Sequence, residues 1–396
     1  MQRGGLQRLG LTLALWAGVA TAQPGIEGTL GQSSTIIEEL GQHGLTLDIS
    51  IIGDHSTVLE GGRNPRSSAD RVLAQAGLII DMDKAVGLPG GTFAINYLGF
   101  HGDDGSIDTG DTQVYSNIDG PSFDALYSLW YQQDLIDDQL AIKFGKMDAN
   151  SDFAYVLNGT AFINSSPGFS PTIMGFPSYP DPSTAINIFW RDKHGPYIGA
   201  GVYDGATQNS LNTGTRGPSS FFGAPNATFY IAEVGTSYMI GQEPGRIGVG
   251  YWHHSGRFTD ITTGANRRAD GSYLVWDQGI YSSPNDMTAV DVFAQYAKTD
   301  DAISAIDTHI AGGAEFTGLL NGRPKDISGL MASYVGFSDA PGAGFVADYE
   351  LTVEAFYGFR PVPWFELKPD MQYIINPGGR GVDDALVGTL RARLAF

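Results

Sequence analysis

From residue 44 onward, hydrophobic and polar residues alternate with a period of two over most of the chain. This spacing is typical of β-strands whose two faces meet different surroundings. Near the C-terminus, Leu386 and Leu394 share one face, whereas Arg391 and Arg393 lie on the other. Clusters of Gly, Pro, Asn and Asp separate the alternating segments. The pattern predicts sixteen strands, at residues 44–53, 71–82, 91–102, 122–133, 139–147, 184–192, 195–204, 227–240, 244–255, 272–282, 289–299, 306–316, 325–337, 349–360, 364–375 and 384–396.

A soluble sandwich also alternates, so the lengths of strands and connections have to decide. Strands of soluble sheets usually have about 5–6 residues, whereas an even number of strands of about ten residues is typical of outer-membrane barrels. The connections after odd-numbered strands are mostly the longer ones, at 54–70, 103–121, 148–183, 205–226, 256–271, 300–305, 338–348 and 376–383. The sequence therefore predicts an all-β fold, a transmembrane antiparallel β-barrel of sixteen strands.

Pairs of neighbouring aromatic residues stand near predicted strand ends, at Trp130–Tyr131, Phe189–Trp190, Tyr251–Trp252 and Trp364–Phe365. Such residues form girdles at the two membrane interfaces of outer-membrane barrels. The alternative is that they are ordinary core aromatics.

The N-terminus has the three parts of a secretory signal peptide. Arg3 and Arg8 precede an apolar run from Leu9 to Val19, and small residues at Ala20 and Ala22 form the cleavage site. We expect residues 1–22 to be removed on export. Residues 23–43 form an N-terminal segment in which a capping box at Thr35–Glu38 predicts a short helix, and residues 44–396 form the barrel.

Charge and composition exclude several classes of function. The chain has 23 basic and 43 acidic residues, a net charge of −20, which argues against binding nucleic acid. It has no cysteine, so disulfides and cysteine-based metal centres are excluded. His253 and His254 are adjacent and would point to opposite faces of a strand. The acidic segment 103–111 does not fit EF-hand spacing, and we interpret it as a solvated external loop, with weak divalent-ion binding as a minor option. No cofactor or metal is expected.

Several segments carry a resemblance to a known family. They are Leu320–Asp326, Glu350 and Glu354 on one strand, Trp364–Gly379, Ala161–Asn164, Tyr281–Ser283 and the final Phe396. In these the chain resembles the carbohydrate-selective outer-membrane porins, although the Trp and Arg of that family's opening segment have no counterpart near residues 28–40. The resemblance implies a bacterial outer-membrane channel for the passive diffusion of monosaccharides such as glucose.

The parity of the strands predicts which charged residues face the lumen. An Arg or Lys that faces lipid at the midplane costs roughly 2–4 kcal/mol, so the polar faces should point inward. The expected lumen residues are Lys143, Arg191, Glu233, Asp291, Glu315, Glu350, Glu354, Arg360, Glu366, Lys368, Asp370, Arg391 and Arg393. Such a ladder of donors and acceptors could exchange hydrogen bonds with sugar hydroxyls. The alternative is that these charges pair with one another.

The longest connection, 148–183, is the third external loop, and the resemblance implies that it folds into the channel as a constriction. Phe169, Phe176 and Tyr179 make it aromatic, and its five prolines between residues 167 and 182 make it stiff. The rings could stack on a pyranose, or they could simply pack the loop on the wall.

Two other functions remain as alternatives. Removing Arg3 and Arg8 with the signal peptide gives the mature chain 21 − 43 = −22 charges, which favours a general cation-preferring porin. An outer-membrane barrel enzyme of the lipase kind would need a Ser/His pair, and neither His253 nor His309 has an evident partner. The expected partners are small neutral sugars and outer-membrane lipid, and the oligomer could be a monomer or a trimer.

Overall fold

The computed structural model describes residues 39–206, 227–284 and 287–396. The predicted signal peptide lies outside the described residues, as does most of the segment 23–43. Of the predicted N-terminal helix only the end is described, and residues 39–42 are helical. None of the described helices is long and apolar enough to cross a membrane.

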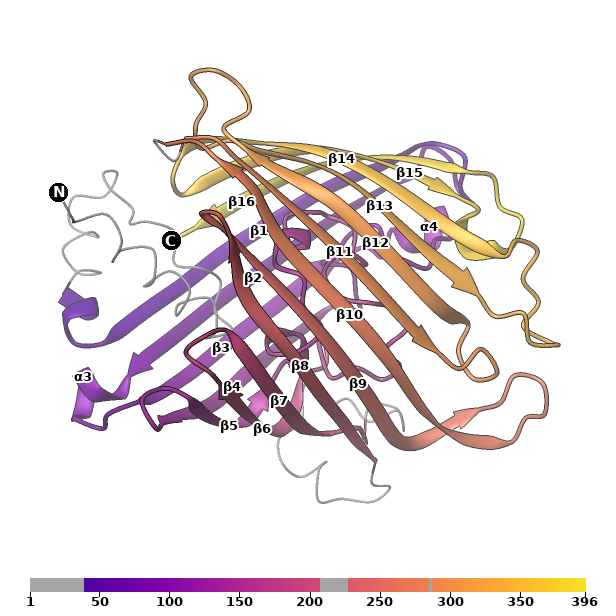
Figure 1. The fold of residues 1–396 in the computed structure, drawn as a ribbon. Helices are drawn as coiled ribbons and strands as arrows, with labels where there is room; N and C mark the ends of the chain where they lie inside the picture. The colour runs from indigo at the N-terminus through magenta and orange to yellow at the C-terminus, as the bar shows by residue number, and fades with distance from the viewer. Residues whose placement is uncertain (1–38, 207–226, 285–286) are drawn as a thin grey trace.

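Sixteen antiparallel strands form a closed barrel (Figure 1). The ring closes where β1 pairs with β16, for example at Asp54 opposite Arg391. The strands are β1 (Leu45–Glu60), β2 (Ser68–Asp81), β3 (Gly91–Gly102), β4 (Phe123–Leu135), β5 (Leu140–Met147), β6 (Ser183–Arg191), β7 (Pro196–Asp204), β8 (Thr228–Ile240), β9 (Glu243–Thr259), β10 (Asn266–Ser282), β11 (Ala289–Thr299), β12 (Ile306–Thr317), β13 (Ile327–Phe337), β14 (Tyr349–Val362), β15 (Phe365–Ile375) and β16 (Ala385–Ala395). The predicted fold class and number of strands are confirmed.

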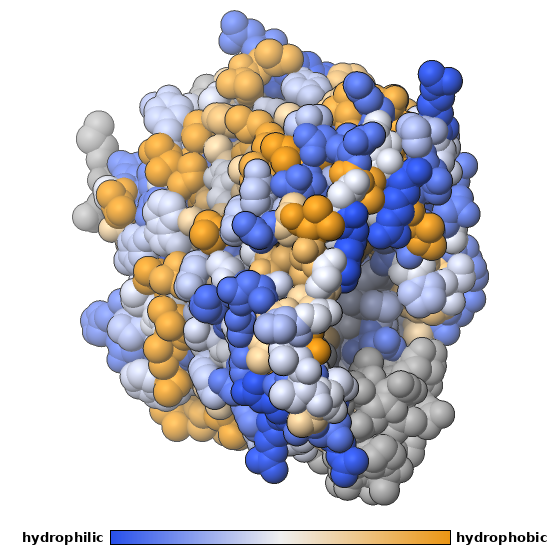
Figure 2. Space-filling view, turned by 90° about the vertical axis from the view of Figure 1, so that its right-hand side faces the viewer, coloured by the Kyte–Doolittle hydropathy of each residue, from blue (hydrophilic) through white to orange (hydrophobic). Residues whose placement is uncertain are grey.

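Besides the helical residues 39–42, the connections of the described residues contain short helices. They are α3 (Met82–Val86), α4 (Ser106–Thr109), η1 (Ala149–Ser151), η2 (Leu157–Gly159) and η4 (Pro377–Gly379). The start of the described chain at residue 39 and the C-terminus lie at one end of the barrel, which we call the end with the termini. Helix α4 lies toward the other end, which we call the loop end (Figure 1). Figure 2 views the loop end, where hydrophilic residues border a recess.

The predicted bounds of two long loops, 54–70 and 256–271, are wrong, because the strands on both sides of each loop extend further than predicted. Residues 54–60 belong to β1 and 68–70 to β2, and residues 256–259 and 266–271 extend β9 and β10 in the same way. The first extension is polar on both faces, so it resembles a loop in the sequence. Its inward Ser56 contacts Thr389 at 2.9 Å, and its outward His55 contacts Asp70 at 2.7 Å.

The outer face of the barrel is apolar. Large hydrophobic side chains stay exposed there, such as Ile51 on β1, Phe144 on β5, Ile188 on β6 and Val249 on β9. Strand alternation divides predicted aromatic pairs between the two faces of the wall. Trp190 and Tyr251 are exposed on the outer face, whereas their neighbours Phe189 and Trp252 are buried inside. The buried Trp130, Phe189 and Trp252 are therefore corrections to the girdle prediction, which stays a prediction for the other members of the pairs.

Two connections fill much of the lumen. Loop 2 comprises residues 103–122 between β3 and β4, and loop 3 comprises residues 148–182 between β5 and β6. Both run inside the barrel (Figure 1), and inward-facing side chains of the wall are buried against them. Burial on the inner face therefore comes from the loops, and on the outer face the same strands present a surface for lipid.

Candidate permeation site

Loop 3 packs on the inner wall through aromatic residues that the sequence reasoning did not single out. The ring of Phe162 lies 5.1 Å from that of Phe356 on β14 and 5.7 Å from that of Phe293 on β11. The ring of Phe153 lies 4.9 Å from that of Phe189 on β6. These contacts belong to one large buried cluster and confirm that the third external loop folds into the lumen.

Carboxylates of the wall bind the backbone of loop 3. Leu157 and Asn158 donate their consecutive amides to Asp277 on β10 at 3.2 and 2.9 Å. The amide of Ala154 donates to Glu233 on β8 at 3.1 Å. Hydrogen bonds of this kind, from an amide to an ionised acceptor, are stronger than those between neutral groups. They fix the path of the loop across the barrel.

Loop 2 enters the lumen as well, which corrects the interpretation of its acidic segment as a solvated loop. Of its carboxylates only the first two, Asp103 and Asp104, are exposed, whereas Thr109, Asp111 and Gln113 are buried. Burial raises the pKa of Asp111. Polar side chains and backbone amides make many of the contacts that hold loop 2 inside, and its Tyr115 and Ile118 pack in buried hydrophobic clusters of the inner wall.

The side chain of Gln113 anchors loop 2 on the far wall. Ser333 on β13 donates its hydroxyl to Gln113 Oε1 at 2.6 Å, and Gln113 Nε2 donates to the Ser333 carbonyl at 3.2 Å. The ring of His309 also contacts the Ser333 hydroxyl, at 2.9 Å. This is a Ser/His pair that the sequence reasoning did not find. Because neither side chain is exposed, the pair has no access to a substrate.

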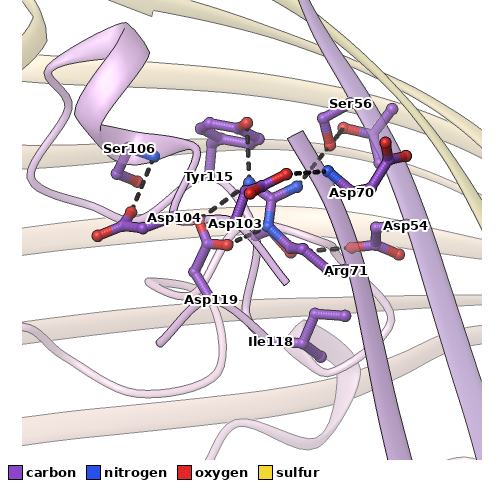
Figure 3. A network of polar contacts seen from close by, with 12 residues as sticks. Asp54, Ser56, Asp70, Arg71, Asp103, Asp104, Ser106, Tyr115, Ile118 and Asp119 are labelled. Atoms are coloured by element: carbon purple, nitrogen blue, oxygen red, sulfur yellow. Dashed lines mark hydrogen bonds and ion pairs between the residues drawn. The ribbon is translucent and has the colours of Figure 1, made fainter. Parts of the chain in front are cut away.

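Arg71 on β2 is the centre of a polar network that the sequence reasoning missed (Figure 3). Its guanidinium donates to Ser56 at 2.9 Å, to Tyr115 at 2.8 Å and to both carboxylate oxygens of Asp119. The network ties loop 2 to β1 and β2. The sequence does predict that Arg71 faces inward, because Arg71 and Gln75 alternate with the outward residues Val72, Ala74, Ala76 and Leu78.

Other basic residues of the inner wall are also paired with carboxylates. Arg391 donates two hydrogen bonds of 2.7 Å to Asp54 on β1. Lys143 lies 3.0 Å from Asp152 of loop 3. Arg246 donates to Glu233 at 2.6 Å. Many charges of the lumen thus neutralise one another over short distances.

The predicted lumen residues fall into two groups by burial. Buried inside the barrel are Lys143, Glu233, Glu350, Glu354, Glu366, Lys368, Asp370 and Arg391. Partly exposed, and closer to the end with the termini, are Arg191, Asp291, Glu315, Arg360 and Arg393. The structure brings Arg360, Glu366 and Lys368 together, with both cations bonded to the carboxylate. Asp291 and Glu315 are cross-strand partners on β11 and β12.

The three predicted aromatic residues of loop 3 are all partly exposed. The rings of Phe169 and Phe176 lie 5.8 Å apart, and that of Phe176 lies 5.7 Å from Phe229 on β8. Tyr179 packs 5.7 Å from Phe123 and donates its hydroxyl to the carbonyl of Ile118 in loop 2. Each ring therefore contacts the protein on one side and remains partly accessible to a solute.

Nothing in the described part of the chain forms a metal centre. No group of three or more His, Asp or Glu residues there is arranged to hold a metal ion. His254 is buried in the wall, and its ring lies 5.1 Å from that of Phe258 in an edge contact. The predicted opposite orientation of the two neighbouring histidines is confirmed, since His253 stacks on the outward-facing Tyr230.

A closed barrel of sixteen antiparallel strands, with its long loops folded inward, is the architecture of a porin. A sequence model of one porin family, described as "Carbohydrate-selective porin, OprB family", matches residues 67–396. The chain belongs to this family, which consists of channels rather than enzymes.

Individual relatives agree with this assignment. The chain is 24% identical to Porin B of Pseudomonas aeruginosa, over 99% of this chain and 96% of that protein. The high-pH structure of OprB from Pseudomonas putida matches with a TM-score of 0.81 and 21% identity, covering 92% of this chain and 97% of that one. A loop-deletion mutant of the outer-membrane protein OmpT of Vibrio cholerae matches with a TM-score of 0.53 and 10% identity, covering 89% and 99%. These structural likenesses show the fold.

Proposed function

We propose that the protein is an outer-membrane porin through which small neutral sugars, monosaccharides such as glucose above all, diffuse passively. The observation that carries the proposal is the pairing of charges inside the barrel. Arg391 with Asp54, Lys143 with Asp152 and Arg71 with Asp119 place opposite charges in contact. Paired charges offer many polar groups but little net field, which suits a neutral solute with many hydroxyls.

The proposed path combines ring faces with hydrogen-bonding groups. The partly exposed Phe169, Phe176 and Tyr179 would contact the apolar face of a pyranose near the constriction. Below them, Arg360, Arg393 and the other partly exposed charged residues would exchange hydrogen bonds with its hydroxyls. Conduction requires that each contact be weak enough to release the sugar, and no covalent or metal chemistry is involved.

The exposed acidic residues support a cation preference as the second candidate. Asp103, Asp104, Asp339, Asp348, Asp383 and Asp384 are exposed, and all lie in connections that follow odd-numbered strands. They would concentrate cations at the loop end. Because they lie outside the wall, we expect them to change ion access without selecting between neutral solutes.

We also propose that the chain is exported by a signal peptide cleaved after Ala22 and inserted with its termini toward the periplasm. The small-residue site at Ala20 and Ala22 supports the cleavage. Short periplasmic turns are typical of such barrels, and the turns between β6 and β7 and between β8 and β9 at the end with the termini are short. N-terminal sequencing of the protein purified from outer membranes tests the cleavage site directly.

The experiment that tests the function is single-channel conductance of refolded protein in a planar bilayer, titrated with glucose and, separately, with a small diacid. We expect glucose to reduce the conductance saturably, because a weak site in the constriction is occupied. We expect the diacid to have no saturable effect. A glucose effect no larger than that of bulk viscosity would refute the sugar site and favour a general pore.

A further inference from the structure

Glu350 and Glu354 lie on the inner face of β14, separated by Thr352, and neither is exposed. Because both lie on the polar face of the strand, the sequence predicted that they line the lumen and could bind a passing sugar. A buried carboxylate needs donors to replace its lost water. The identity of those donors decides what each glutamate does.

Two donors to Glu354 are consecutive backbone amides of loop 3, and the carboxyl of Asp370 on β15 is also hydrogen-bonded to it. Ile163 donates to one carboxylate oxygen at 2.6 Å, and Asn164 donates to the other at 2.9 Å. The next polar contact in this region is also with the loop, because Asn164 Nδ2 donates to Gln372 on β15 at 3.2 Å. Lys368 donates to the carbonyl of Ala161 at 2.6 Å. Glu354 is therefore one point of a wider attachment of loop 3 to β14 and β15.

The donors to Glu350 are consecutive backbone amides of loop 2. Thr112 donates at 2.9 Å and Gln113 at 3.1 Å. A third amide, that of Gly378 in the connection between β15 and β16, donates at 2.6 Å. The two glutamates thus bind in the same way, and each attaches a different loop to the same strand.

The two loops are also bonded to each other, through residues next to those that bind the glutamates. Asn117 of loop 2 donates its amide to the carbonyl of Ile163 at 2.7 Å, and Ser165 of loop 3 donates to the carbonyl of Val114 at 3.0 Å. The Asn117 side chain donates to the carbonyl of Phe162 at 3.1 Å. Loops 2 and 3 are therefore joined into one layer across the lumen.

We propose that Glu350 and Glu354 are positioning residues, which hold loops 2 and 3 as a single constriction and so set the largest solute that passes. Their carboxylate oxygens already accept two or three amides each, which leaves them little capacity to bind a sugar. The inference rests on the channel function proposed above, but it concerns the size of the opening and not the identity of the sugar.

The test is polymer exclusion by single channels of the full chain, with neutral polyethylene glycols of increasing size. In Glu354→Gln one acceptor oxygen becomes an NH2 group that faces an amide hydrogen, so one charge-assisted bond is lost. We expect the closed layer to open about tenfold more often, the shift that corresponds to losing one such bond. The largest polymer that enters should then increase, with more open-channel noise, and Glu350→Gln should act in the same direction.

Asp48→Asn is the matched control, because Asp48 is an inward carboxylate of β1 that accepts from Gln75 on β2 at 2.6 Å and not from a loop amide. We expect it to alter ion selectivity without changing the polymer limit. An unchanged polymer limit in both Glu350→Gln and Glu354→Gln, with weaker block by glucose, would overturn the proposal and make the glutamates sugar ligands. A widened limit in Asp48→Asn would also overturn it, since loss of a lumen charge alone would then suffice.

If neither glutamate variant folds, Asn117→Ala decides the question, because it removes one bond between the loops without touching the wall. A larger polymer limit supports the joined constriction, and an unchanged limit contradicts it. Polymer exclusion needs no sugar site. A wild-type channel that excludes polymers but is not blocked by glucose would therefore refute the proposed sugar function alone.

Discussion

At the scale of single residues, Arg71 joins three parts of the molecule through one guanidinium. It contacts Ser56 on β1, and Tyr115 and Asp119 in loop 2, and it is 1% exposed. Arginine can do this because its five N–H groups point in fixed directions. A sequence pattern shows that such a residue faces inward, but its partners come from a loop whose path no periodicity describes.

Replacing Arg71 with Met should destabilise the barrel strongly. Removing one partner of a buried ion pair leaves an uncompensated charge, at a cost of roughly 3–5 kcal/mol. The measurement is urea unfolding in lipid vesicles. Lys84→Met is the control, because its pair with Asp81 is exposed and such pairs contribute about 0–1 kcal/mol. Similar losses in the two variants would contradict the role of the network.

Asp119 should make stability depend on pH in mild acid. Burial raises the pKa of Asp119 from 3.8 to about 6, although Arg71 lowers it. Between these values the unfolded chain has released its proton and the folded chain keeps it, so this group lowers stability as pH rises. Above about pH 6 both states are ionised and the effect of this group stays constant. Unfolding of Asp119→Asn, compared with wild type at a series of pH values, should lack this component. Parallel curves for the two proteins would refute the assignment.

At the scale of elements, the strands were predictable and the interior was not. Alternation located all sixteen strands, and β3 and β11 have the predicted bounds. It failed in residues 54–60, where polar residues on both faces resemble a loop. It also failed for loop 2, because Asp111 and Gln113 are as polar as solvated residues and become buried only through partners far along the chain. Alternation predicted that Glu350 faces the lumen. It could not predict that the side chain accepts hydrogen bonds from the amides of Thr112 and Gln113.

The assignment of faces predicts how charge is tolerated along the outside of a strand. Ile188 on β6 is 46% exposed on the outer face, so Ile188→Lys should cost about 2–4 kcal/mol if this position lies near the bilayer midplane. Leu59→Lys is the control, at the loop end of β1, where the cost should be about 0–1 kcal/mol. Both are measured as the change in folding free energy in lipid vesicles. Equal costs would show that the outer face does not contact lipid.

At the scale of the whole molecule, net charge and lumen charge are different quantities. The chain carries a net charge of −20, yet Arg391 with Asp54 and Lys143 with Asp152 are neutral pairs inside the barrel. Several carboxylates, among them Asp339 and Asp384, are instead exposed in the connections. Composition alone therefore overstates the field that a solute meets in the constriction.

This separation predicts that cation selectivity depends on salt, whereas block by glucose does not. The Debye length falls from about 10 Å at 0.1 M salt to about 3 Å at 1 M, so exposed carboxylates at the loop end are screened from the pore at high salt. The measurement is the reversal potential across a KCl gradient, at low and at high mean concentration, together with the half-blocking concentration of glucose at both. We expect cation preference to fall toward zero at high salt, with glucose block unchanged, because it depends on short-range contacts. A cation preference that persists at 1 M would require an unpaired charge within the constriction itself. In that case the general cation-preferring porin would become the better description of the channel.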